Sequence, residues 1–349
     1  MDAIDWDLAQ RVGELIAGNP PPGELASDSV GELTQRFAER VSSYAGLQPS
    51  TALPTLEAVD RPRWIAANLK TMRPLLEPLA ARGLAARKPA MLEAPLSRAM
   101  RSASGVMLGA QVGALTGMLS QRVLGQYDIE LLNPSGTPRL LLVAPNLGQA
   151  ARNLQVDRDQ LTSWVAIHEV THAVQFSGAP WLQGHLAGLL RELVERMQVS
   201  VSASEVLNGL RGGDLRTLVA RIRRGEMMRI TLGEARWALV EHIQSAMSLI
   251  EGHAEHVMDA VGAEVLPSLA RLRQAMTRRR EARSVPWRVL ERLLGIELKL
   301  RQYEVGRRYC DAVVARGGPE MLTRAFQSPA SMPSAAELER PDLWLARMA

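Results

Sequence analysis

Apolar residues recur at spacings of three and four along most of the chain, which is the period of helices that bury one face. Glycine and proline gather at a few breaks between these stretches, such as NPPPG at 19–23 and RGGPE at 316–320. The pattern therefore predicts a mainly helical protein. The expected helices span 4–17, 28–45, 56–82, 90–123, 158–177, 181–199, 215–224, 232–251 continuing to 261, 264–282, 287–315 and 333–347.

Only one region has the pattern of β-strands. The segments QYDIELL (126–132) and RLLLVAP (139–145) flank NPSGTP (133–138), which is rich in turn-forming residues. Two apolar strands around such a turn indicate a hairpin. We therefore expect the α+β class, mainly α with a small β-hairpin or sheet.

One predicted helix has an unusual composition. Residues 102–121 carry no charge, and glycine recurs at every fourth position from Gly105 to Gly117. Glycines at this spacing let another helix approach closely, as in pairs of membrane helices. Six of the twenty residues are polar, however, which is unfavourable for a bilayer span. We therefore expect a helix buried in a soluble core and keep membrane association as the less favoured alternative.

The composition narrows the classes of function. The single cysteine, Cys310, forbids an intrachain disulfide and a cysteine-cluster metal site, so we expect a reducing, cytoplasmic location. Aromatic residues make up 4% of the chain, and Lys+Arg exceeds Asp+Glu by only 4, so we expect no nucleic-acid partner. The N-terminus lacks the pattern of a secretory signal. The arginine-rich stretch 270–288 suits phosphate or anionic lipid, but we favour a solvated helix end.

All six histidines fall within 89 residues, and two of them form the motif His168-Glu169-Val170-Thr171-His172. Asp157 is a good N-cap, Gln160 occupies the capping-box position and Gly178 is a helix terminator, so we expect the motif to lie inside a helix. Residues four apart share a helix face, so both imidazoles can bind one metal ion while the glutamate reaches its water. Zn²⁺ suits this ligand set. A helix with two surface histidines beside a glutamate is the competing interpretation.

A third ligand has to come from elsewhere in the chain. The metzincin pattern needs a glycine and a histidine where this chain has Gln175 and Gly178, so it is excluded. Within 245–262, Glu251 sits at the edge of an apolar stripe and precedes Gly252. A carboxylate at the edge of a buried face favours a cation as partner.

These residues resemble known families. The HExxH motif, followed 79 residues later by Glu251-Gly252-x-Ala254-Glu255, is similar to the gluzincin arrangement. The segments 143–182 and 299–309, with the glycine ladder, resemble a family of uncharacterised bacterial zincin-like metalloproteases and hydrolases. Some of its members carry a name that associates them with deazaflavin-coenzyme biosynthesis. The resemblance covers most of the chain, and it implies a zincin-like pair of active-site helices inside a large helical domain.

The resemblance also implies roles for individual residues. His168, His172 and Glu251 would be the zinc ligands, and Glu169 the general base and later proton donor. Glu255 stands where many gluzincins have an aspartate that orients a ligand histidine, so a supporting role is expected for it.

Other groups compete for the remaining tasks. His253 and His256 are rivals of the favoured Glu251 for the third ligand position. Tyr303 is the first candidate for stabilising the oxyanion, and His253, His256 and His185 follow it. The alternative for each of these side chains is an ordinary packed or surface residue.

The sequence thus predicts a zinc-dependent hydrolase, in first place a metallopeptidase, in which Glu169 activates a zinc-bound water against a peptide bond of a peptide or protein substrate. A non-catalytic scaffold with a structural zinc and a zinc amidohydrolase with a non-peptide substrate are the alternatives. We expect one domain over 1–349, with an N-terminal helical part (1–123), a part with the hairpin and metal-site helices (124–262) and a C-terminal helical part (263–349).

Overall fold

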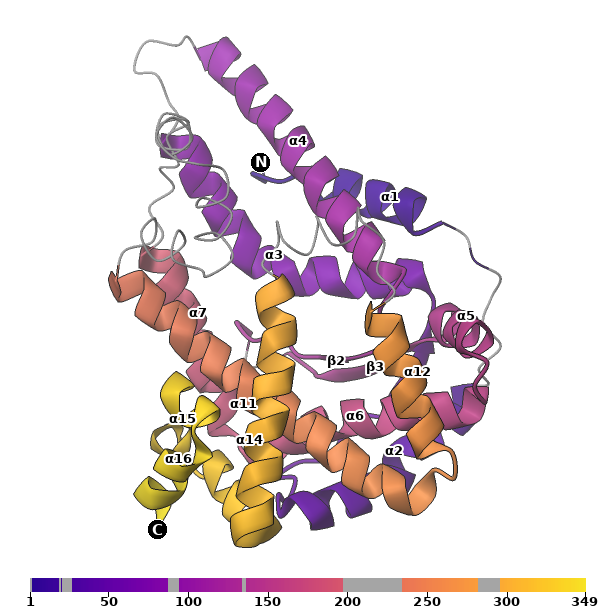
Figure 1. Ribbon diagram of the computed structural model, residues 1–349. Coiled ribbons are helices and arrows are strands. Elements are labelled where there is room, and N and C mark those ends of the chain that lie inside the picture. Colours follow the sequence, from indigo (N-terminus) through magenta and orange to yellow (C-terminus); the bar gives the residue numbers. More distant parts are fainter. Residues whose placement is uncertain are drawn as a thin grey trace, which may run out of the picture.

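The computed structural model describes residues 2–18, 20, 27–86, 94–133, 136–196, 234–281 and 296–349, and the predicted helix 215–224 lies outside them. Helices dominate the described chain, and a small sheet lies among them (Figure 1). The predicted fold class is confirmed. The helices are α1 (Trp6–Ala17), α2 (Ser27–Ala45), α3 (Arg61–Ala86), α4 (Ala94–Ser120), α5 (Ala144–Leu154), α6 (Arg158–Gly178), α7 (Trp181–Arg196), α11 (Glu234–Val265), α12 (Leu269–Glu281), α14 (Ile296–Thr323), α15 (Ala335–Glu339) and α16 (Pro341–Met348), with 3-10 turns η1 (Arg324–Phe326) and η2 (Pro329–Ser331).

The sheet has three strands, β1 (Leu56–Val59), β2 (Gly125–Asp128) and β3 (Arg139–Val143), in the order β1-β3-β2. β2 and β3 pair antiparallel, which confirms the predicted hairpin. Leu140 and Leu142 of β3 pack into the core that contains α6, whereas Leu141 and Val143 pack against α1 and α3. The helices α3 and α6 lie on opposite sides of the sheet in Figure 1. Because both faces are covered, β3 is apolar at almost every position.

The prediction for residues 56–82 is wrong at its start. Residues 56–59 form β1, which pairs parallel to β3 with Leu56 opposite Leu140. Helix α3 begins only after Asp60, whose side chain accepts a hydrogen bond from the backbone N–H of Arg63 at 2.8 Å. The apolar residues of β1 continue the spacing of those in α3, so periodicity alone does not separate the strand from the helix. The N-cap at Asp60 is the local signal that marks the boundary.

Helix α5 was not predicted from the sequence. Its stretch APNLGQAARNL begins with Ala144 and Pro145, which the pattern assigned to the strand 139–145. Proline is tolerated in the first helical turn because the N–H that it lacks has no partner there. The predicted C-terminal helix 333–347 is divided into α15 and α16 at Arg340.

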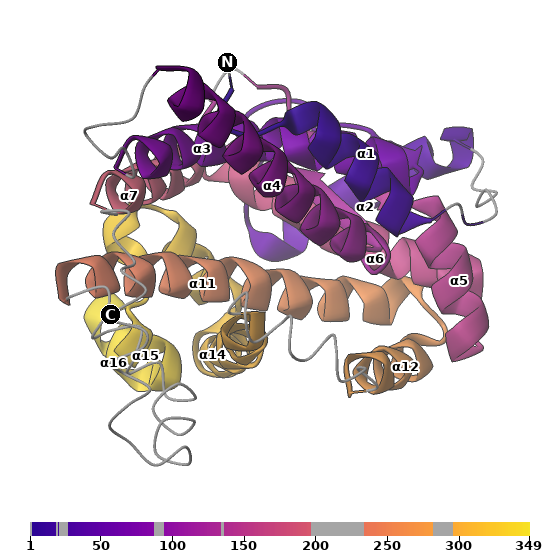
Figure 2. The same ribbon diagram turned by 90° about the horizontal axis from the view of Figure 1, so that it is seen from above.

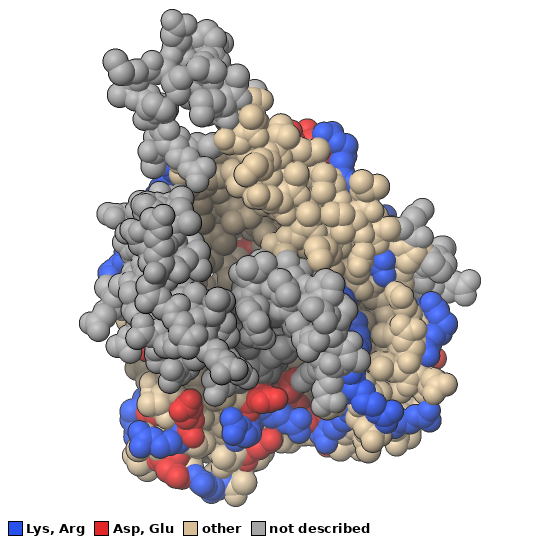
Figure 3. All heavy atoms as spheres, turned by 45° about the horizontal axis from the view of Figure 1, so that its top comes forward, with Lys and Arg blue, Asp and Glu red and all other residues tan. Residues whose placement is uncertain are grey.

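The glycine ladder lies in α4 and packs against α1. A side chain at Gly113 would collide with the carbonyl group of Ala9. The other side of α4 faces outward, with Val106 and Met107 exposed, and Figure 3 shows a broad surface here with few charges. Residues 102–120 form the one described helix that is long and apolar enough to span a membrane, and 28% of it is buried. The expectation that this helix is buried in the core is therefore wrong, because its glycines form one contact, with α1, and most of the helix is not buried. Membrane association remains the less favoured prediction.

The long helix α11 runs across α6 and packs against α14 (Figure 2). At the crossing with α14, Gly252 and Gly306 face each other so closely that a side chain on either would collide with the opposing backbone. Two helices can approach to this distance only where both lack a side chain. The crossing fixes the position of α11 directly beside Glu251.

Candidate metal centre

Helix α6 begins where the sequence predicts, because the Asp157 side chain accepts a hydrogen bond from the backbone N–H of Gln160 at 2.8 Å. The capping box expected from Gln160 does not form. Its side-chain oxygen instead accepts hydrogen bonds from the backbone and the hydroxyl of Ser268, just before α12. With the start of α6 fixed in this way, the predicted motif falls in the middle of the helix.

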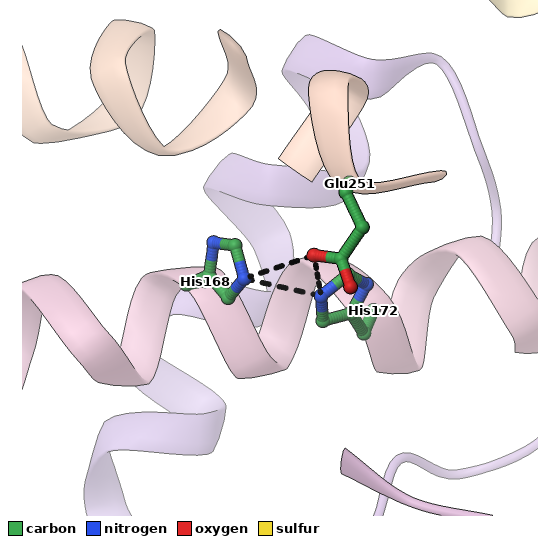
Figure 4. A group of neighbouring side chains, drawn as sticks. All are labelled: His168, His172 and Glu251. Atoms are coloured by element: carbon green, nitrogen blue, oxygen red, sulfur yellow. Dashed lines mark hydrogen bonds and ion pairs between the residues drawn. The ribbon is translucent and has the colours of Figure 1, made fainter. Parts of the chain in front are cut away.

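Three side chains from two helices converge on one point (Figure 4). His168 and His172 extend from α6, and their Nε2 atoms lie 3.1 Å apart. Oε2 of Glu251, from α11, lies 3.7 Å from Nε2 of His168 and 3.4 Å from Nε2 of His172. Ligand atoms at about 2.1 Å from a tetrahedral zinc ion lie about 3.4 Å from one another. The three observed distances bracket this value.

The chemistry of these atoms also fits a cation. Oε2 of Glu251 is buried and has no hydrogen-bond partner among the described residues. A buried carboxylate oxygen needs positive charge beside it, and two imidazole nitrogens this close to each other need a proton or a cation between them. A divalent cation among the three atoms satisfies the carboxylate and both imidazoles at once. This is the one group of potential metal ligands found in the described part of the chain.

The closeness of the three side chains also shifts the pKa values of His172 and Glu251. Burial alone would lower the pKa of His172, but the carboxylates of Glu251 and Glu169 raise it to about 9. Burial would raise the pKa of Glu251, yet the two facing imidazoles hold it well below its usual value. Both shifts favour positive charge at this point, as a proton or as a metal ion.

Gln175 supports the centre and was not identified as a site residue from the sequence. Its Oε1 lies 2.9 Å from Nδ1 of His172, and its Nε2 donates to the backbone carbonyl of Ile250 at 2.8 Å. One buried amide therefore orients a ligand histidine and ties α6 to the residue before Glu251. Its position three residues after His172 was considered only as a mismatch to the metzincin pattern. An amide one turn after a ligand histidine, on the same face, is the signal that could have identified it.

Glu169 lies on the other side of the motif, against strand β2. Its carboxylate accepts a hydrogen bond from the backbone N–H of Tyr127, and a side chain on Gly125 would lie 2.8 Å from its Oε1. Burial raises the pKa of Glu169, against the opposing effect of the two histidines. β2 is an outer strand of the sheet, so the predicted base lies beside a strand edge.

The two rival histidines on α11 are engaged elsewhere. Nδ1 of His253 lies 2.9 Å from Nε2 of Gln175, and burial lowers the pKa of His253 to about 3. The ring nitrogens of His256 lie 2.8 Å from the hydroxyl of Tyr44 and 2.6 Å from Oδ1 of Asp311. Neither histidine belongs to the group around Glu251.

The remaining predicted residues have less defined places. Glu255 is buried one turn after Glu251, and its role beside a ligand histidine stays a prediction. Tyr303 lies in α14, three residues before Gly306, but its side chain lies outside the described residues, so the oxyanion role also stays a prediction. His185 packs against Trp181 on α7 and is not part of the group.

The comparisons with known proteins agree with this site. The model of the zincin-like metallopeptidase family matches residues 4–345, and the chain belongs to this family. A crystal structure described as that of "a putative hydrolase with a novel fold from Chloroflexus aurantiacus" is similar, with a TM-score of 0.70 and 28% identity over 99% of this chain and 98% of that chain. A comparison with curated proteins found no match. Family and neighbour together support a zinc hydrolase, and the family implies a metal, typically zinc.

Proposed function

We propose that the protein is a zinc-dependent peptidase whose metal ligands are His168, His172 and Glu251. The observation that carries the proposal is the convergence of their three donor atoms, which all lie within 4.8 Å of one another. Three protein ligands are typical of catalytic zinc sites, whereas structural sites are closed by four. Because the described residues offer these three ligands and no fourth, we favour a catalytic site over a scaffold with a structural zinc.

Glu169 is the proposed general base. When bound, zinc supplies a Lewis acid that polarises a carbonyl group and acidifies water. Burial raises the pKa of the Glu169 carboxyl toward neutral pH. A base whose pKa lies near the working pH takes up and releases protons most efficiently. The hydrogen bond from the backbone N–H of Tyr127 holds the carboxylate in place. Glu169 thus takes a proton from water and then delivers it to the leaving nitrogen, with Tyr303 as the candidate for stabilising the oxyanion.

The position of β2 supports a peptide as substrate. An extended peptide can add to an exposed strand edge through main-chain hydrogen bonds. β2 is the last strand on one side of the sheet, and its Gly125 lies directly beside Glu169. A peptide aligned along β2 would have its backbone carbonyl groups near the candidate metal centre.

The proposal is tested by peptide-library cleavage, followed by mass spectrometry, with wild type and Glu169→Gln. Glu264→Gln is the matched control because Glu264 is exposed on α11. We expect Glu169→Gln to keep its zinc and to lose about a thousandfold in activity, since it lacks only the base. The control should cleave like wild type. Cleavage by Glu169→Gln at the wild-type rate, or no cleavage by wild type loaded with zinc, would contradict the proposal.

A further inference from the structure

A cavity that shares no lining residue with the metal centre lies between α12 and the segments that end α4 and α5. Figure 1 shows α12 beside α5. The cavity has a volume of about 590 Å³, within the range of pockets that hold small organic ligands. None of the described residues that line it belongs to the metal centre. They are Arg122, Asn153, Leu154, Gln155, Arg271, Gln274, Ala275, Arg278 and Arg279.

The charge of this lining is one-sided. Of the nine described residues that line it, four are arginines and none is an aspartate or a glutamate. Three more, Asn153, Gln155 and Gln274, have amide side chains, which can also donate hydrogen bonds. Such a lining offers many donors and positive charge to one bound group.

Two of the guanidinium groups are held in place by backbone carbonyls. Arg271 donates to the carbonyl oxygen of Gln155 at 2.6 Å, and Arg279 donates to that of Arg122 at 2.8 Å. A guanidinium has five N–H donors, and each of these bonds uses one of them. The bonds therefore hold the two planar groups at the cavity wall and leave further N–H donors for a ligand.

Capping of helix ends does not fully explain this cluster. Basic residues are favoured in the last turn of a helix, but Arg271 lies in the first turn of α12, where the helix dipole disfavours a positive charge. Burial and the neighbouring charge of Arg122 both lower the pKa of Arg279. A phosphate group in the cavity would bring negative charge to the Arg279 guanidinium, whose charged form burial and Arg122 disfavour.

We infer that this cavity binds a phosphate group. The planar guanidinium fork matches phosphate oxygens and binds them in a bidentate manner, so four arginines around one cavity are suited to a phosphate with more than one negative charge. The phosphate can belong to a free phosphorylated molecule or to the headgroup of an anionic lipid. The lipid source has support from α4, which ends at this cavity and has Val106 and Met107 exposed on its outer side.

The test uses the full-length protein and two probes. Calorimetric titration with inorganic pyrophosphate at about 150 mM salt measures binding of a free phosphate ligand while screening weak surface attraction. Sedimentation with vesicles of phosphatidylcholine, with and without phosphatidylglycerol, measures binding of a lipid headgroup. Arg278→Gln removes one exposed arginine of the cavity, and Arg308→Gln, on α14, is the matched control because it removes one exposed arginine elsewhere. Binding of pyrophosphate to metal at the other site would be equal in all three proteins.

We expect saturable binding by wild type, weakened about tenfold by Arg278→Gln and unchanged by Arg308→Gln. This result with pyrophosphate assigns the cavity to a free phosphorylated ligand. The same result only with vesicles that contain phosphatidylglycerol assigns it to a lipid headgroup. No binding of either probe, or equal weakening by both variants, would overturn the inference.

Discussion

His172 has a defined contact at each of its ring nitrogens. Nε2 faces His168 and Glu251, while Nδ1 lies 2.9 Å from Oε1 of Gln175. A carbonyl oxygen at Nδ1 selects the tautomer that leaves Nε2 free for a metal. The proposed ligand role of His172 therefore depends on Gln175 as well as on its own position in the motif.

The Gln175→Leu variant tests this dependence. Leucine fills a similar volume but cannot hold Nδ1 of His172 or the carbonyl of Ile250, so we expect zinc affinity to fall about 10- to 100-fold with the fold intact. Competition with a chromophoric chelator measures the affinity. Gln35→Leu, at an exposed position of α2, should leave it unchanged. Equal affinities in Gln175→Leu and wild type would show that the amide does not support the site.

Zinc binding should also depend on pH. In the metal-free protein the pKa of His172 is raised to about 9, so this side chain carries a proton at neutral pH. Zinc must displace that proton, and the apparent affinity should therefore rise with pH, by about tenfold per unit, until pH reaches about 9. Titrations at several values between about pH 6 and 8 measure the slope. An affinity that is constant over this range would argue against His172 as a ligand.

At the scale of elements, the crossing of α11 and α14 sets the position of Glu251. We expect Gly252→Val to destabilise the protein by about 3 kcal/mol, because its side chain would collide with the backbone of α14 at Gly306. Gly184→Ala is the control, since nothing lies near Gly184 on α7, and it should stabilise by about 0.5 to 1 kcal/mol. Urea unfolding measures both changes. A Gly252→Val variant as stable as wild type would mean that the two helices do not cross as described.

The elements also show which parts of the structure could be predicted. Helix α6 was predicted closely because its cap at Asp157 and its motif are local signals. Strand β1 was missed because its pairing with β3, over eighty residues later, leaves no local mark except the cap at Asp60. The sequence places Gly252 directly after Glu251, but only the structure shows that this glycine admits the backbone of Gly306. Contacts of this kind depend on a distant segment, and no periodicity in one segment contains them.

At the scale of the whole molecule, the candidate metal centre joins two helices that are far apart in the sequence. His172 and Glu251 are separated by 79 residues, and both lie in the main hydrophobic core region between α6 and α11. A ligand that binds only the folded protein stabilises it, by about 4 kcal/mol at a concentration a thousand times its dissociation constant. Zinc should therefore raise the midpoint of thermal unfolding of the metal-free protein by about 5 °C or more. An equal rise in His172→Ala would show that zinc acts at another site.

The zinc content of the purified protein tests the metal centre most directly. Wild type and His172→Ala are produced with added zinc, purified without chelators or metal-affinity columns, and analysed by mass spectrometry of the elements. We expect about one zinc ion per chain in wild type and less than about a tenth of that in the variant, because the two remaining ligands do not hold the ion. Wild type without zinc, or a variant with the same zinc content as wild type, would contradict this expectation.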